Sequence, residues 1–84
     1  MNEGDIAGRL RSFILTDLLR NPHYPLQDNE PLITGGLLDS FAIAQIGVWA
    51  EKEFGVYIPD SDMTHENMDT VQQMARRIAQ GLTS

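Results

Sequence analysis

The sequence predicts a small all-α protein, a bundle of four helices in which three are longer and one is short. Apolar residues recur at spacings of three and four along several segments, as on one face of a helix. No segment alternates apolar and polar residues in the way that a half-buried strand does. A chain of 84 residues has the size of one domain, which we expect to cover residues 1–84.

The first helix is expected over about residues 5–20. Asn2 or Asp5 can cap its start, and Pro22 is expected to stop it soon after its last turn. Its apolar side chains form one stripe along the helix: Ile6, Leu10, Phe13, Ile14 and Leu18. Leu15 and Leu19 widen this stripe, so we expect the helix to pack on two neighbours.

Residues 21–39 are expected to form a long loop between the first and second helices. Three prolines remove backbone donors, and Gly35-Gly36 frees the backbone before the next helix. A short helical turn can form near Pro31–Thr34. Five apolar side chains are placed to hold this loop against the core: Leu26, Leu32, Ile33, Leu37 and Leu38. We therefore expect an ordered connection.

The second helix is expected over about residues 40–54, with Gly55 ending it. From Phe41 to Ala50 the only polar side chain is that of Gln45. A domain this small cannot cover such a helix on every side, so we expect an exposed apolar strip along it.

Two more helices are expected in the last third of the chain. Ile58-Pro59-Asp60 makes an abrupt turn, and a short helix over about 60–66 follows it. The last helix is expected over about 70–81, where Thr70 and Gln73 form a capping box at its start. Gly81 is expected to mark a frayed end.

The charge distribution disfavours nucleic acid as a partner. The net charge is −6, and residues 28–69 hold nine acids against Lys52 alone. The longest uncharged helical stretch is too short to cross a membrane, and Glu3 and Asp5 stand where an export signal would be basic, so we expect a cytoplasmic protein. With no cysteine and no metal-binding histidine spacing, no metal site is expected.

Ser40 is the residue most informative about function. It lies where the glycine-rich stretch passes into the second helix, beside backbone N–H groups that can satisfy an anion. Ser and Asp are also the commonest helix caps, so the Asp39-Ser40 pair can be structural and nothing more.

Four motifs in order resemble those of a stand-alone acyl carrier protein. Gly-Leu-Leu-Asp-Ser-Phe opens the second helix, Glu-Phe-Gly closes it, Ile-Pro-Asp turns the chain, and Asp-Thr-Val starts the last helix. The resemblance covers about residues 5–80. It implies the acyl-carrier type of four-helix bundle, with no catalysis by the chain itself.

The resemblance implies that Ser40 carries a covalent 4′-phosphopantetheine. A phosphopantetheinyl transferase would attach this arm from coenzyme A with Mg²⁺, and Asp39 matches the acid that helps the transferase recognise the serine. The arm's thiol would carry an acyl or aminoacyl group as a thioester. The implied partners are that transferase, an acyl- or aminoacyl-loading ligase or transferase, and downstream synthase enzymes, with the carrier itself a monomer.

The same resemblance assigns the two faces of the second helix. The face that meets partner enzymes comprises Phe41, Ala44, Gln45, Val48 and Glu51. The core face comprises Ile43, Ile46, Ala50 and Phe54, with Met63, Met68 and Val71 around the far wall. For Phe41 and Val48, burial in the core is an equally open alternative, because core is the usual place of large apolar residues.

Departures from the pattern bear on the cargo. The first turns of the second helix lack the acids usual in carriers for fatty-acid synthesis, and Gln45 replaces an expected acid, as in D-alanyl carrier proteins. A specialised pathway that loads a distinct acyl group is therefore expected, with an aminoacyl or D-alanyl type of carrier as the alternative. Gly47 offers a further hypothesis: it leaves a core gap for part of an acyl chain, unless Trp49 or a loop leucine fills that gap.

Two other classes of function remain. In a plain helical interaction domain, Ser40 would be only a cap and the second helix would dock on a receptor. A small enzyme has less support, because the sequence places no base beside Ser40 and arranges His23 and His65 in no triad.

Overall fold

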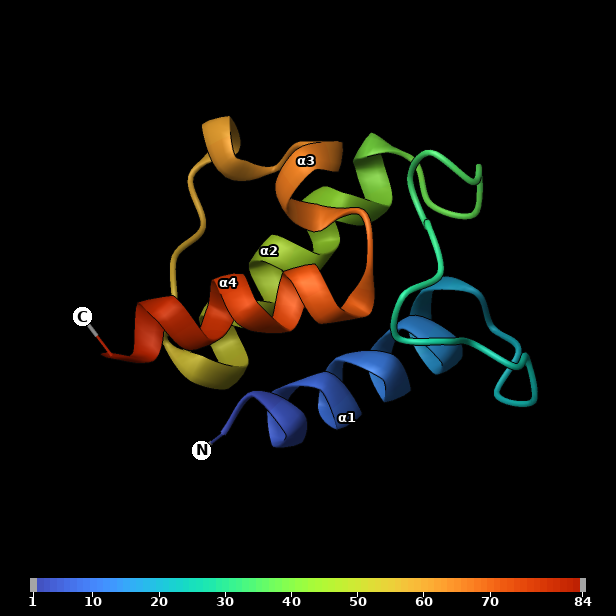
Figure 1. Ribbon diagram of the computed structural model, residues 1–84, viewed down its shortest axis with the longest axis horizontal. Coiled ribbons are helices and arrows are strands. Elements are labelled where there is room, and N and C mark those ends of the chain that lie inside the picture. The colour runs from blue at the N-terminus through green and yellow to red at the C-terminus, as the bar shows by residue number, and fades with distance from the viewer. Residues whose placement is uncertain (1, 84) are drawn as a thin grey trace.

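The computed structural model describes residues 2–83, and the regular elements within them are all helical (Figure 1). In chain order they are α1 (Glu3–Phe13), a π-helix (Ile14–Leu18), α2 (Ser40–Phe54), a 3₁₀ turn (Asp60–Asp62), α3 (His65–Met68) and α4 (Val71–Thr83). The predicted all-α class, with three longer helices, a short one and a long loop after the first, is confirmed. Met1 and Ser84 of the predicted domain lie outside the described residues.

The first helix begins earlier than predicted and ends in a different geometry. Asn2 is its cap, with its side-chain oxygen accepting from the Asp5 N–H at 2.8 Å, so α1 starts at Glu3 and not at residue 5. From Ile14 the helix widens into the π-helix, where the Leu19 N–H donates to the Ile14 carbonyl at 2.8 Å. Arg20 then takes a left-handed backbone conformation with φ 54°, which ends the helix.

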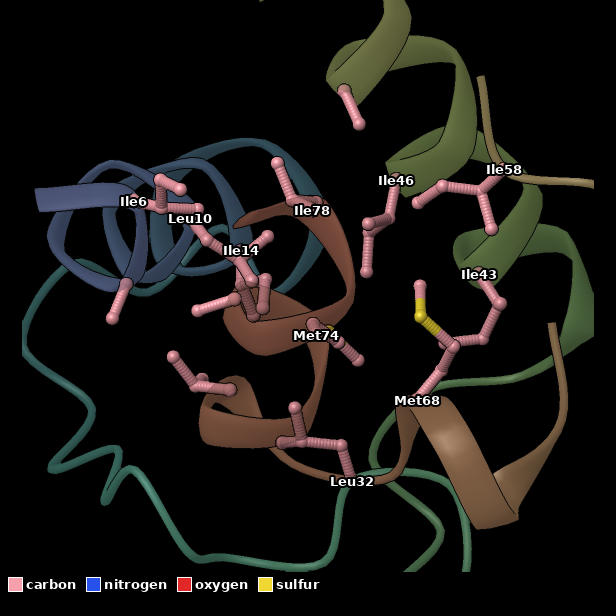
Figure 2. Packing of buried hydrophobic residues seen from close by; sticks show 14 of the residues in the cluster. Ile6, Leu10, Ile14, Leu32, Ile43, Ile46, Ile58, Met68, Met74 and Ile78 are labelled. Atoms are coloured by element: carbon pink, nitrogen blue, oxygen red, sulfur yellow. The ribbon is translucent and has the colours of Figure 1, made fainter. Parts of the chain in front are cut away.

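The core lies around α4, which packs between α1 and α2 (Figure 2). Figure 2 shows α1 side chains on one side and α2 side chains on the other, with Met74 and Ile78 of α4 between them. The predicted core residues Ile43, Ile46 and Ala50 are buried, as are Met68 and Val71. The other two residues predicted to lie in the core, Phe54 and Met63, are half-buried at the edge of the core.

The predicted short helix over 60–66 is wrong in its bounds. The structure has the 3₁₀ turn Asp60–Asp62 and then the separate single turn α3, His65–Met68. Met63, with ψ 61°, and the extended Thr64 break the helical path between them. Arg77 of α4 holds the first piece by donating two hydrogen bonds, at 3.0 and 3.1 Å, to Asp62.

The last helix has the predicted start and a longer end. The Gln73 N–H donates to Thr70 Oγ1 at 3.0 Å and the Thr70 N–H to Gln73 Oε1 at 3.2 Å, so the capping box is confirmed. The helix continues through Gly81 to Thr83, so the fraying expected at Gly81 is wrong. A Cβ on Gly81 would overlap the Val56 side chain, so this glycine lets Val56 pack against α4.

The space beside Gly47 is filled, so the hypothesis of an open gap there is wrong. Gly47 is buried in α2, and a Cβ there would overlap the Cε atom of Met63. The residue that fills the space is therefore Met63, and neither Trp49 nor a loop leucine. Trp49 lies on the other side of the helix, where its ring stacks on that of Phe13 with 5.1 Å between centroids.

Among residues 2–83, no helix has both the length and the apolar character needed to cross a membrane.

Candidate functional site

Asp39, and not Ser40, caps the second helix. Asp39 has an extended backbone, and its Oδ1 accepts from the Ala42 N–H at 2.9 Å. Its carbonyl accepts the first helical bond, from the Ile43 N–H at 3.1 Å. Ser40 is the first residue of α2, so the interpretation that Ser40 is only a cap is wrong.

The Ser40 side chain is exposed and available. Its hydroxyl forms no hydrogen bond with any of residues 2–83. The backbone N–H groups of Ser40 and Phe41 likewise have no acceptor within that range, because they precede the first helical bond. An anion attached to the Ser40 oxygen would therefore find two free donors at the positive end of α2.

The loop before Ser40 follows one defined path. Leu32 is buried, and its carbonyl accepts from the N–H groups of both Leu37 and Leu38 at 2.9 Å. Gly36 has φ 85°, a conformation that costs glycine little and other residues more. Leu38 is also buried, so the chain is anchored immediately before the cap. Near Pro31–Thr34 the chain makes a turn, with Gly36 donating to the Ile33 carbonyl at 3.1 Å, and no regular helix.

Asp69 clamps this loop to the start of α4. Its carboxylate accepts from the Ile33 N–H at 2.8 Å and from the N–H and hydroxyl of Thr34 at 3.0 and 2.8 Å. Its carbonyl accepts from the Leu32 N–H at 2.7 Å. Desolvation acts to raise the pKa of Asp69, but the bonds from Thr34 and Ile33, helped by nearby His65, outweigh it and hold the pKa below its usual value.

The five residues predicted to meet partners all lie exposed on α2. Phe41 is 70% exposed and Val48 56%, so the alternative that these two belong to the core is wrong. Phe41, Ala44, Gln45 and Val48 line one groove, whereas Glu51 does not line it. The expected exposed apolar strip on this helix is confirmed.

That groove runs between the π-helix and α2, and we call it the α2 groove. Its apolar lining includes Phe13 stacked on Trp49, and Phe54, which lies outside the lining, meets Trp49 edge-on at 5.4 Å. The residues that line it are Phe13, Thr16, Asp17, Leu18, Arg20, Phe41, Ala44, Gln45, Val48, Trp49 and Lys52.

The sequence did not identify the first wall of this groove. Phe13 and Leu18 belong to the apolar stripe of the first helix and were expected to be core residues, yet both are only half-buried. Leu18 lies in the π-helix, whose wider turn shifts it from the position that a regular helix would give it, whereas Phe13 is the last residue of the regular α1. We find no signal for a π-helix in residues 14–18.

The geometry gives Ser40 no catalytic partner within the described residues. No histidine or carboxylate within residues 2–83 accepts a hydrogen bond from its hydroxyl, which a serine nucleophile needs for activation. In the same range, no three His, Asp or Glu side chains gather as a metal site would require.

Comparison with models of known protein families finds no match for this chain, and comparison with curated protein sequences finds none either.

Proposed function

We propose that this protein is a carrier that bears its cargo on a 4′-phosphopantetheine arm attached to Ser40. The observation that carries this proposal is that capping of α2 and exposure of a hydroxyl belong to two different residues, Asp39 and Ser40. Asp39 performs the capping, which leaves the Ser40 hydroxyl exposed and without a hydrogen bond to residues 2–83. A serine needed only for structure would occupy the cap position itself.

The attachment is a transfer of a phosphoryl-linked arm to the serine oxygen. Ser40 Oγ attacks the phosphorus of coenzyme A that bears the pantetheine, and the bond from that phosphorus to the adenosine bisphosphate leaving group breaks. A base of the transferase takes the hydroxyl proton. Mg²⁺ binds the pyrophosphate linkage of coenzyme A, which is the linkage that is cleaved. The new phosphodiester carries one negative charge beside the free N–H groups of Ser40 and Phe41, which stabilise it.

The arm supplies a thiol, and a thioester on it is the form in which cargo is held. The chain contains no cysteine, so this thiol enters only with the arm. The proposal is supported by the four motifs that resemble those of acyl carrier proteins, which lie around Ser40, at the end of α2, at the turn before Asp60–Asp62 and at the start of α4.

The exposed side of α2 is the proposed face for partner enzymes. It adjoins Ser40 and presents Phe41, Ala44, Gln45, Val48 and Glu51. The partners are a phosphopantetheinyl transferase, which reads Asp39 as well as Ser40, a ligase or transferase that loads the cargo, and the enzymes that use it. We place the protein in the cytoplasm, as a monomer, in a specialised pathway with an acyl cargo or, as suggested by Gln45, an aminoacyl cargo.

A second function, that of a helical interaction domain, is favoured by one specific observation. Phe41 and Val48 expose most of their apolar surface on one side of α2. Such a strip can dock on a receptor whether or not Ser40 is modified. Modification of Ser40 separates the two functions.

The decisive experiment is intact-protein mass spectrometry after incubation with coenzyme A, Mg²⁺ and a promiscuous phosphopantetheinyl transferase. We expect one added phosphopantetheine on the wild type and none on Ser40→Ala. Ser61→Ala is the matched control, because Ser61 is also exposed in a short helical turn, and it should be modified like the wild type. A wild-type chain that stays unmodified while a known carrier is modified would favour the interaction domain.

A further inference from the structure

The α2 groove is continuous with the helix end that bears Ser40. A second hollow at the start of α2 is lined by Asp39 and Phe41, the two neighbours of Ser40 in the chain. The two hollows share Asp17, Leu18, Arg20, Phe41 and Gln45. From Ser40 to Lys52, which lines the far part of the groove, the helix rises about 18 Å. A group tethered at Ser40 thus meets a continuous channel along α2.

The two unpaired cations of the described chain both border this groove. Four of the six basic side chains form ion pairs: Arg9 with Glu53, Arg11 with Asp28, Arg76 with Glu3, and Arg77 with Asp62. Within residues 2–83, Arg20 and Lys52 form none, and each lines the groove.

The groove is therefore a locally basic place on an acidic protein. Asp17 is the one carboxylate that lines it, and its Oδ1 accepts a hydrogen bond from Thr16 Oγ1 at 3.0 Å. Arg20 stands at the end nearest Asp39, and Lys52 in the last turn of α2. Between these two cations lies apolar surface that includes Val48 and Trp49. An apolar floor between two cations complements a ligand that is apolar in its middle and anionic at both ends.

The interior next to Gly47 does not offer the same space. Met63 Cε occupies the position that a side chain at 47 would take, and the neighbouring Ile43 and Ile46 are buried against the core. A chain entering there would have to displace a packed methionine, whereas the α2 groove is already open.

We propose, on the basis of the carrier function above, that the α2 groove holds the loaded arm and that the cargo is an acyl chain ending in a carboxylate. The phosphodiester on Ser40 lies near Arg20, and the pantetheine part of the arm folds back in the hollow at the start of α2. The acyl methylenes then pack on Val48 and Trp49, and the terminal carboxylate pairs with Lys52. The groove thereby shields the loaded arm on the surface of the carrier and distinguishes an acidic acyl chain from a neutral one of equal length.

The test compares two cargoes on the same protein. The phosphopantetheinyl transferase is given decanoyl-coenzyme A or decanedioyl-coenzyme A, so that each acyl arm is attached to Ser40 whole, and mass spectrometry verifies the loading. Trp49 is the only tryptophan and lines the groove, so its fluorescence and its quenching by acrylamide report occupancy directly. Amide chemical shifts of Val48 and Lys52 give a second readout.

We expect the decanedioyl arm to protect Trp49 from acrylamide more than the decanoyl arm does. In Lys52→Gln this preference should fall by about two- to five-fold in the docked-to-free ratio, as for the loss of one exposed ion pair. Arg76→Gln, which removes a cation from the exposed side of α4, is the matched control and should keep the preference.

Each other outcome identifies what has failed. Loading without any change at Trp49, Val48 or Lys52 overturns the groove proposal and leaves the carrier function standing. Equal protection by both arms overturns the assignment of an acidic cargo. A protein that accepts neither arm while a known carrier accepts both overturns the carrier function and the groove proposal together.

Discussion

At the scale of single residues, the structure assigns helix capping and an exposed hydroxyl at the start of α2 to two different residues, which the sequence alone could not do. Asp39 Oδ1 accepts a hydrogen bond from the Ala42 N–H at 2.9 Å, so it is Asp39 that stabilises the start of the helix as its cap. Ser40 follows it with an exposed side chain and no hydrogen bond within residues 2–83. The sequence shows two capping residues side by side, and only the backbone geometry decides which one caps.

Substitution of these two residues should therefore have opposite consequences. Asp39→Ala is expected to lower the free energy of unfolding by about 1 kcal/mol, because the cap of α2 is lost. Ser40→Ala should change it by less than about 0.5 kcal/mol, as for other exposed positions. Urea unfolding followed by circular dichroism measures both. Asp39→Asn keeps a capping oxygen and should restore most of the loss; a larger effect at Ser40 than at Asp39 would contradict the assignment.

Two helical glycines provide a second residue-scale comparison. Gly8 in α1 is exposed with nothing near the position of a Cβ, so Gly8→Ala should raise the free energy of unfolding by about 1 kcal/mol through helix propensity. At Gly81 the new methyl group would overlap the branched Val56 side chain, so Gly81→Ala should lower the free energy of unfolding by about 1–3 kcal/mol. Thermal unfolding of both variants tests the packing of Val56 on α4; stabilisation by Gly81→Ala would show that Val56 moves aside freely.

At the scale of elements, the loop of residues 21–39 is held chiefly by the start of α4. The Asp69 carboxylate takes three hydrogen bonds from Ile33 and Thr34, across 35 or 36 positions of sequence. The Gln72 N–H adds a bond to the Asp28 carbonyl at 3.0 Å. The loop that presents Ser40 is thus positioned by a helix whose first residue, Val71, lies 31 positions after Ser40.

This clamp predicts a pH dependence specific to Asp69. Its folded pKa lies below the ordinary value near 3.8, so the carboxylate contributes stability above that value and loses it as the pH falls through the folded pKa. We expect Asp69→Asn to be less stable than the wild type by about 1–2 kcal/mol at pH 7, since a charged acceptor of three bonds is replaced by a neutral, partly exposed one.

The difference between wild type and Asp69→Asn should shrink as the pH falls below about 4, where the wild-type carboxyl takes up its proton. Urea unfolding at several pH values between 7 and 3 measures it. Because the other carboxylates are common to both proteins, their titration cancels in the difference. A difference that stays constant across this range would show that the charge of Asp69 does not hold the loop.

The elements predicted correctly are those whose signals are local. Gly55 after α2 and the Thr70–Gln73 box before α4 act within a few residues, and both helix boundaries were found from them. The π-helix and the break at Met63 were not predicted. Nor was the Asp69 clamp, because it joins segments that lie 35 or 36 positions apart in the sequence. The α2 groove was missed for the same reason, although the exposed residues on its α2 wall were identified.

At the scale of the whole molecule, α4 packs between α1 and α2 (Figure 2). The opposite side of α2 is exposed at Phe41 and Val48. On that side α2 carries Ser40, the exposed apolar strip and Lys52, and Arg20 follows the neighbouring π-helix. The core thus needs only one face of α2, and the other is free for proteins that act on a group at Ser40.

A negative charge on that exposed face should leave folding and the modification of Ser40 unchanged but slow the transfer of cargo. Val48 is 56% exposed, so Val48→Glu should change the free energy of unfolding by less than about 0.5 kcal/mol and leave phosphopantetheinylation of Ser40 intact. Transfer of cargo to or from a partner enzyme that grips the apolar strip should slow, because docking would bury the new carboxylate. Tyr57→Glu adds the same charge at a residue 68% exposed outside the strip, and it should transfer at the wild-type rate. Equal rates for Val48→Glu and the wild type would place the partner face elsewhere on the molecule.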